Sequence, residues 1–343
     1  MQKFLVIQTA FIGDVVLATA LIEKLHVYFP DARIDFLVRK GNEALLTGHP
    51  FLHEVLIWDK REHKLRNLWR LIGKIRQTRY DTVINVQRFA ATGLLTAFSG
   101  AGQTIGFDKN PLSIVFTRKI PHIVGHRHEI ERNQTLIAAL TDEQPAKPRL
   151  YPSKADEEKV NSYKTKPYIT ISPASVWFTK QYPPEKWAAF IRQLPGGYTV
   201  YLLGAPLDKQ LCEQIRALAA PDNTAAAAAP SPVILSGQLS FLQSAALMKD
   251  ADMNYVNDSA PLHFASAVNA PVTAVYCSTI PAFGFGPLSD KRFIVEIQQP
   301  LDCRPCGLHG YRACPKGHFH CAWKIEDRQL LQTLTGGSLS PRL

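Results

Sequence analysis

Two aspartates, far apart in the chain, sit where chemistry is often placed in α/β proteins. Asp14 comes shortly after the apolar run Phe4–Ile7, and Asp258 follows the run Met253–Val256. Each pattern is typical of a strand that leads into the first turn of a helix. Such a junction presents unpaired N–H groups and partial positive charge, which suits a phosphate or a reacting polar group. Because parallel sheets bind ligands at the carboxyl ends of their strands, we expect half a site in each half of the chain, with a cleft between two domains.

The first half of this site is the pair Gly13 and Asp14. The missing side chain of Gly13 would let a ligand approach the backbone closely. The Asp14 carboxylate could accept a proton from a substrate hydroxyl, as a general base does. The alternative is an aspartate that only stabilises the helix N-terminus through the helix dipole.

The second half combines a lysine loop with the Asp258 segment. Lys180 lies on a loop of small residues that includes Ser175, and its ammonium could neutralise charge on a diphosphate. A solvated surface lysine is the alternative. Asp258 could bind sugar hydroxyls. The backbone N–H groups of Ser259 and Ala260 could hold a phosphate. His263 lies one helical turn after Ser259 and could face the cleft. An N-capping aspartate and a core histidine are the alternative.

A basic amphipathic segment is the main source of the positive charge. It begins with Lys60, Arg61 and Lys64 and continues to residue 79, with leucines, isoleucines and Trp69 between the cations. The net charge of +10 favours an anionic partner, either nucleic acid, acidic lipid or a phosphorylated substrate. We expect this segment to dock on an anionic membrane or a phosphorylated acceptor. A solvated surface helix is the alternative.

Four of the six cysteines gather near the end of the chain, at Cys303, Cys306, Cys314 and Cys321. Four thiolates could hold a structural zinc ion, but the second pair is spaced more widely than in common zinc knuckles. We predict no catalytic metal and no cofactor. The cysteines are weak candidates for zinc, with a loop of reduced thiols as the alternative. The chain contains neither GxGxxG nor GxxxxGK[ST], so a dehydrogenase or a P-loop enzyme would lack its fingerprint.

The surrounding elements alternate between strand and helix. The expected strands are 4–8, 34–38, 55–58, 82–86, 104–107, 168–171, 199–203, 233–235, 254–256, 272–276 and 293–297. The expected helices are 15–28, 65–77, 93–98, 127–140, 184–193, 208–219, 241–249 and 261–268. This alternation predicts an α/β protein with two Rossmann-like domains and parallel sheets, covering 1–150 and 151–343, with a proline-rich linker at 141–152. We expect no membrane span and no signal peptide, and therefore a cytoplasmic protein.

Taken together, these segments resemble glycosyltransferase family 9, the ADP-heptose:lipopolysaccharide heptosyltransferases, over nearly the whole chain. The segments that carry the resemblance are Phe11–Val15, Ile105–Phe107, His128–Asn133, Lys180–Pro183 and Asn257–His263. Two departures are Ala260, where the family usually has glycine, and a loop at 203–206 without its usual acidic residue, for which Asp208 could substitute.

The resemblance implies a GT-B fold, with two facing Rossmann-like domains and an inverting, metal-independent transfer from a nucleotide sugar to a glycolipid. The N-terminal domain would bind the acceptor, and the C-terminal domain would bind the donor. Asp14 and Lys180 match the catalytic positions. The donor-binding set is Gly13, Ser175, Asp258, Ser259, Ala260 and His263. The expected sugar is a heptose or a related sugar, and the expected donor is an ADP-sugar. The expected acceptor is a lipopolysaccharide core or a lipid A-type acceptor, and the expected location is the cytoplasmic face of the inner membrane.

Two alternatives remain open at this point. One is a GT-B transferase that uses another nucleotide sugar. The other is a non-catalytic, zinc-containing protein that binds an anionic ligand. We expect no nucleic-acid partner, because the basic residues cluster in one helix without the aromatic spacing of a single-strand binder.

Overall fold

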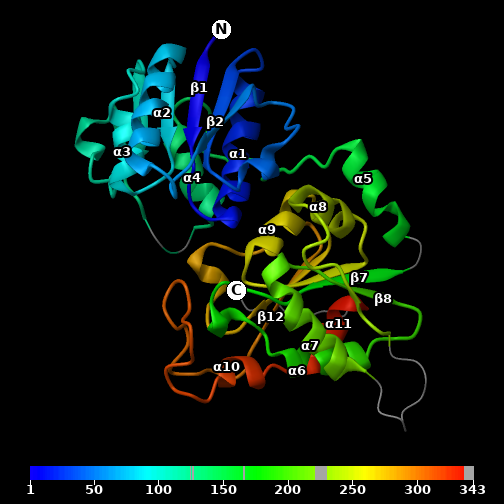
Figure 1. The fold of residues 1–343 in the computed structure, drawn as a ribbon. Coiled ribbons are helices and arrows are strands. Elements are labelled where there is room, and N and C mark those ends of the chain that lie inside the picture. The colour runs from blue at the N-terminus through cyan, green and yellow to red at the C-terminus, as the bar shows by residue number, and fades with distance from the viewer. Residues whose placement is uncertain (124, 126, 165–166, 221–229, 336–343) are drawn as a thin grey trace. The chain divides into compact units, whose positions relative to one another are not determined.

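The computed structural model describes residues 1–123, 125, 127–164, 167–220 and 230–335. The chain divides into two compact units, unit 1 at Met1–Tyr151 and unit 2 at Pro152–Leu343 (Figure 1). In the described ranges each unit holds a six-stranded sheet whose neighbouring strands are all parallel. The predicted fold class, an α/β protein with two Rossmann-like domains, is confirmed.

Unit 1 has the strand order β3-β2-β1-β4-β5-β6. Its strands are β1 (Lys3–Ile7), β2 (Arg33–Arg39), β3 (Glu54–Trp58), β4 (Thr82–Asn85), β5 (Gln103–Phe107) and β6 (Arg118–Ile120). Its helices are α1 (Ile12–Tyr28), α2 (Lys64–Thr78), α3 (Ala90–Ala97) and α4 (Glu129–Ile137). Helix α1 packs against α4, and α2 packs against α3. Leu5 and Ile7 of β1 join the core beneath α2 and α3, as expected for a central strand buried on both faces.

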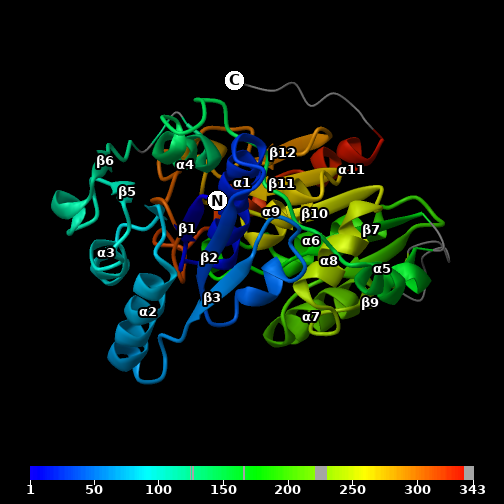
Figure 2. The same cartoon turned by 90° about the horizontal axis from the view of Figure 1, so that it is seen from above.

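Unit 2 has the strand order β12-β11-β10-β7-β8-β9, and Figure 2 shows β10, β11 and β12 on one side of β7. Its strands are β7 (Tyr168–Ser172), β8 (Thr199–Leu202), β9 (Val233–Ile234), β10 (Met253–Asn257), β11 (Val272–Tyr276) and β12 (Arg292–Glu296). Its helices are α5 (Lys154–Val160), α6 (Pro184–Arg192), α7 (Lys209–Ala219), α8 (Phe241–Lys249), α9 (Ala260–Ala267), α10 (His320–Trp323) and α11 (Asp327–Leu334).

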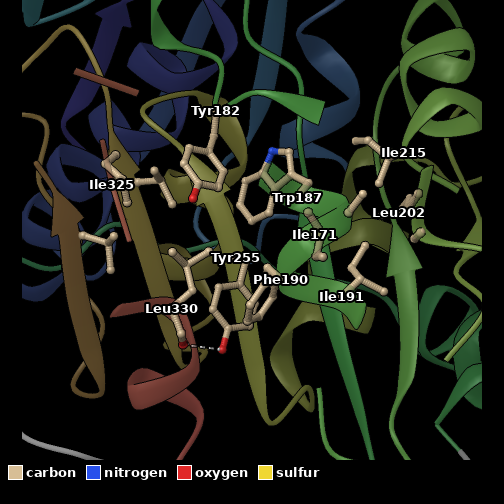
Figure 3. Close-up of a cluster of buried hydrophobic side chains, with 14 of the residues drawn as sticks. Ile171, Tyr182, Trp187, Phe190, Ile191, Leu202, Ile215, Tyr255, Ile325 and Leu330 are labelled. Atoms are coloured by element: carbon tan, nitrogen blue, oxygen red, sulfur yellow. Dashed lines mark hydrogen bonds between the residues drawn. The ribbon is translucent and has the colours of Figure 1, made fainter. Parts of the chain in front are cut away.

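The core of unit 2 fixes the position of its central strands. Trp187 of α6 is fully buried and packs edge-on against Tyr182, while Phe190 lies against Tyr255 of β10 (Figure 3). The Tyr255 hydroxyl donates to the Leu330 carbonyl oxygen at 3.1 Å, which ties α11 to the same core. Full burial of each large side chain contributes roughly 2–3 kcal/mol. The loop between β7 and α6 is therefore anchored at its α6 end by buried aromatic side chains.

Each sheet reverses its direction of growth at one place, which is where open α/β sheets bind ligands. In unit 1 this switch point lies between β1 and β4, and in unit 2 it lies between β10 and β7. Asp14 follows β1, while Lys180 and Asp258 follow the two strands at the second switch point. The topology thus places all three residues in the loops or first turns after switch-point strands.

Several elements differ from those expected from the sequence. Helix α1 begins at Ile12, so Asp14 lies inside the first helical turn rather than before it. Strand β6 and helices α5, α10 and α11 were not predicted; none of them is longer than eight residues. Residues 221–229 of the alanine-rich stretch and residues 336–343 lie outside the described residues.

Candidate active site

Lys180 and Asp258 form an ion pair at the switch point of unit 2. The Lys180 Nζ atom lies 2.7 Å from Asp258 Oδ2, and both side chains are largely buried. Asp258 also accepts a hydrogen bond from Thr279 Oγ1 at 2.6 Å. A buried pair of this kind holds a positive charge close to the first turn of α9, where phosphate is favoured.

The strand end that carries Asp258 is tied to both sides of the lysine loop. The Asn257 Nδ2 atom donates to the Pro173 carbonyl oxygen at 2.6 Å, and its Oδ1 atom accepts from the Tyr182 N–H at 3.1 Å. Ser175 lies on the same loop, where its carbonyl oxygen accepts from Gln181 Nε2 at 2.6 Å. One amide therefore fixes how the loop after β7 meets the end of β10.

Helix α9 begins at Ala260, with Ser259 as its N-cap. The Ser259 side chain makes no capping hydrogen bond, and Pro261 occupies the first turn. This leaves the helix N-terminus open to an anion beside the Lys180–Asp258 pair. His263 is 5 % exposed, and its ring lies 6.3 Å from the ring of Phe285, so it is a buried histidine of α9. Its donor-binding role stays a prediction.

The structure adds a residue to this site that sequence reasoning missed. Thr279 follows β11, the strand next to β10, and its hydroxyl binds Asp258 directly. The available signal was its place just after a buried strand, since the ends of adjacent parallel strands meet at one edge. Asp208, considered for the nucleotide, instead caps its own loop by accepting from the Ala205 N–H at 2.7 Å.

In unit 1, Asp14 occupies the first turn of α1 in a site that disfavours charge. Burial raises the pKa of Asp14 from 3.8 to about 6, and the nearby Glu129 carboxylate adds to the shift. Hydrogen bonds from backbone N–H groups and the Arg39 guanidinium act in the opposite direction. A carboxylate with a pKa close to neutrality is suited to take up and release a proton. Gly13 precedes it in the same turn.

Lys60 is held beside the β1–α1 loop. Its Nζ atom donates to Thr9 Oγ1 at 2.9 Å and to the Thr9 carbonyl oxygen at 3.1 Å, and it lies 4.7 Å from the centre of the Trp58 ring. Burial lowers the pKa of Lys60 to about 8, and repulsion from Arg39 contributes. Arg61 and Lys64 are exposed at the start of α2, so the structure brings only Lys60 of these three into contact with that loop.

The four late cysteines line a single cavity of about 270 Å³, together with His318. All four are free thiols. Burial raises the pKa of Cys321 to about 12, so this thiol is protonated at neutral pH. Among the described residues, no three His, Cys, Asp or Glu side chains form a group that could hold a metal ion. We therefore assign no metal-dependent step to this cavity.

Two α/β units, each with a six-stranded parallel sheet, are the architecture of the GT-B class of glycosyltransferases. Residues 68–309 match the family model of glycosyltransferase family 9 (heptosyltransferase). The match covers more than half of the chain, so the protein belongs to this family and is a glycosyltransferase. The resemblance found in the sequence is confirmed, and an enzyme is favoured over the non-catalytic binding protein.

Relatives of known name agree with this assignment. The chain is 28 % identical over 283 residues to the lipopolysaccharide heptosyltransferase 3 of Escherichia coli, covering 78 % of this chain and 82 % of the relative. Its fold matches the solved structure of the E. coli ADP-heptose lps heptosyltransferase II with a TM-score of 0.78, at 22 % identity and with 98 % of each chain covered. It also matches an E. coli heptosyltransferase solved with ADP, with a TM-score of 0.74 at 16 % identity, covering 98 % of this chain and 100 % of that one.

Proposed function

We propose that this enzyme transfers a heptose from an ADP-sugar to the core of a lipopolysaccharide, with inversion at the anomeric carbon. The observation that carries the proposal is the Lys180–Asp258 pair beside the open N-terminus of α9. Together they supply a cation, a helix dipole and a carboxylate that can accept hydrogen bonds from sugar hydroxyls. These are the groups that a nucleotide diphospho-sugar requires.

The donor half neutralises the leaving group. As the bond between the anomeric carbon and the diphosphate oxygen breaks, negative charge grows on the departing nucleoside diphosphate. Lys180 turns from Asp258 toward that charge, and the N–H groups at the start of α9 add to the stabilisation. Asp258, with Thr279 bound to it, is then free to hold the sugar. The names of the relatives support ADP as the nucleotide and heptose as the sugar.

The acceptor half activates the nucleophile. Asp14 takes the proton of the acceptor hydroxyl while that oxygen attacks the anomeric carbon from the face opposite the leaving group. The proton ends on the carboxylate, and the oxygen forms the new glycosidic bond. The raised pKa of Asp14 supports this role, because a base with a pKa of about 6 is ionised at neutral pH and still holds a proton well.

The basic region of unit 1 supports an acceptor that is anionic and lies in a membrane. Residues 60–119 carry twelve Lys or Arg against three Asp or Glu, a net charge of +9 out of the +10 of the whole chain. Lys60 would contact the acceptor. Arg61, which precedes α2, and Lys64, its first residue, are exposed, and α2 also exposes Leu65 and Trp69. Among the described residues, no helix is long and apolar enough to cross a bilayer. We propose peripheral attachment to the cytoplasmic face of the inner membrane, driven by cations and interfacial aromatic side chains.

The direct test is transfer by the purified protein. The protein is incubated with ADP-heptose and with heptose-deficient lipopolysaccharide cores, and the products are identified by mass spectrometry. A mass gain of one heptose with the wild type, and none with Asp14→Asn, would support the proposal. A matched series with UDP- and GDP-sugars identifies the nucleotide. If only a UDP- or GDP-sugar supports transfer, that nucleotide sugar, and not ADP-heptose, is the donor. Breakdown of ADP-heptose without a glycosylated acceptor would contradict the acceptor assignment.

A further inference from the structure

Thr179, the residue before Lys180, lies at the centre of a buried hydrogen-bond network. It is 1 % exposed and belongs to the short 3-10 helix Phe178–Lys180. Its N–H donates to the Tyr311 carbonyl oxygen at 3.1 Å, and its carbonyl oxygen accepts from the Ser278 N–H at 3.2 Å. The backbone that carries Lys180 is therefore held from two directions.

The Thr179 hydroxyl completes this network. Its Oγ1 atom accepts from the Tyr311 N–H at 2.7 Å and from the Ser278 hydroxyl at 3.0 Å. The late segment, residues 304–311, comes close to this network. A side chain at Gly310 would place its Cβ atom 2.9 Å from Thr179 Oγ1 and 3.3 Å from Lys180 Cγ. Gly310 also has a φ of +74°, a conformation that favours glycine. The backbone at Gly310 thus passes close to both Thr179 and Lys180.

Arg304 braces the other member of the ion pair. Its guanidinium donates to the carbonyl oxygens of Cys277 at 2.7 Å, Thr279 at 2.8 Å and Tyr276 at 3.3 Å. It also pairs with the Glu296 carboxylate at 2.5 Å. The bracing fixes the turn after β11 that carries Thr279, whose hydroxyl binds Asp258. Planar guanidinium groups suit such a fork of acceptors, and lysine cannot reproduce it.

These contacts form two chains of interactions that meet at the Lys180–Asp258 ion pair. One arm runs from Tyr311 through Thr179 to Lys180, and the other runs from Arg304 through Thr279 to Asp258. Both arms start from the late segment 304–311. A lysine side chain is flexible, so a fixed backbone on its N-terminal side limits the positions that its ammonium can reach.

We propose that the segment 304–311 positions the Lys180–Asp258 pair for the donor, with Thr179 and Arg304 as positioning residues. The inference deepens the proposed function and rests on it, since it takes Lys180 as the group that meets the donor diphosphate. It gives the late cysteine-containing segment a role that does not depend on a metal.

The test is a double-mutant cycle between position 179 and position 180. Thr179→Val keeps the shape of the side chain but removes the hydroxyl, while Thr179→Ser keeps the hydroxyl and serves as the matched control. We expect Thr179→Val to lower kcat/KM for the nucleotide sugar by about tenfold to a hundredfold, the scale of a displaced catalytic group, and Thr179→Ser to stay close to the wild type. In a Lys180→Ala background the same Thr179→Val change should have almost no further effect.

The outcomes separate positioning from simple structural support. If Thr179→Val lowers kcat/KM by the same factor in both backgrounds, or if Thr179→Ser fails to rescue, the hydroxyl does not act through Lys180 and the inference is overturned. If Lys180→Ala itself leaves ADP affinity and turnover unchanged, the proposed function fails instead. Melting temperatures of the wild type and the four variants show whether each protein is folded.

A second cycle covers the case in which Thr179→Val does not fold. Arg304→Lys keeps the charge but loses the fork, and it should lower donor affinity by way of Asp258. We expect its effect on the affinity for ADP-heptose to disappear in an Asp258→Asn background. An undiminished effect in that background would overturn the Arg304 arm of the proposal.

Discussion

Replacing Asp14 by Asn should abolish transfer and yet stabilise the protein. The pKa of Asp14 rises from 3.8 in the unfolded chain to about 6 in the folded one, chiefly because burial disfavours the charged carboxylate. A shift of about two units corresponds to about 3 kcal/mol of folding free energy that is lost when the group ionises. Asn has nearly the same shape without the charge, so Asp14→Asn should recover up to that amount at neutral pH.

The pH dependence gives this prediction its sign. Below pH 3.8 Asp14 is protonated in both states, so wild type and variant should unfold at similar temperatures. As the pH rises to about 6 and beyond, the wild type loses the contribution of the neutral carboxyl, and the variant does not. By pH 7.5 the melting temperature of unit 1 should be higher in Asp14→Asn by several degrees and by no more than about 12 °C.

Differential scanning calorimetry between pH 4 and pH 8 measures this difference, and Asp156→Asn is a suitable control. Asp156 is an N-terminal capping residue of α5 in unit 2, where its carboxylate accepts hydrogen bonds from Ser153, so its loss should lower stability instead. A variant at position 14 that is less stable than the wild type at pH 7.5, or a difference that does not change with pH, would refute the assignment of a buried, charge-disfavouring site.

Three further predictions test the remaining parts of the site. The initial rate of transfer should rise with pH through about 6, falling tenfold per unit below it, because Asp14 must be ionised to accept a proton; a flat profile from pH 5 to pH 7 at saturating substrates would exclude this base. Lys180→Ala should lower kcat by a factor of about 10² to 10³ and should also destabilise unit 2, because it leaves the buried Asp258 carboxylate without its cation. Calorimetry should show that the Lys180→Ala/Asp258→Asn double variant regains stability. No recovery would mean that the ion pair is unimportant for folding. Binding to vesicles with anionic lipid should weaken about thirtyfold in Arg66→Gln/Arg70→Gln, since each exposed cation contributes about 1 kcal/mol; equal binding of the wild type to neutral vesicles in co-sedimentation would contradict electrostatic docking.

The fold could be predicted from the sequence wherever the apolar period was long. Helix α8 and strand β11 begin and end at the expected residues, because each is apolar and is flanked by polar residues or turns. Strand β6 was missed, since three residues with two cations carry no strand signal and only pairing with β5 defines it. Elements set by tertiary contacts rather than local pattern are the ones that sequence reasoning lost.

The same distinction applies to the site. Lys180 and Asp258 were each recognised from their local segment, but their contact joins residues that are 78 positions apart. Thr279 gave only the weak signal of its place just after a buried strand. Thr179 and Arg304 gave no local signal, because a buried threonine or a half-buried arginine has the same sequence environment whether it positions a site or only packs. Their importance follows from the hydrogen bonds they share, which depend on the register between β10, β11 and the late segment.

In the proposed function, the two aspartates occupy similar places in the topology and have two different chemical roles. Both follow a central strand next to a switch point, yet their surroundings differ. Asp14 is partly buried, and desolvation and the Glu129 carboxylate raise its pKa, so this carboxyl group takes up a proton more readily than an exposed one. Asp258 is bound by an ammonium and a hydroxyl, so it is suited to holding cations and hydroxyl groups in place rather than moving protons. Exchange of these environments, rather than exchange of the residues, would be needed to exchange their roles.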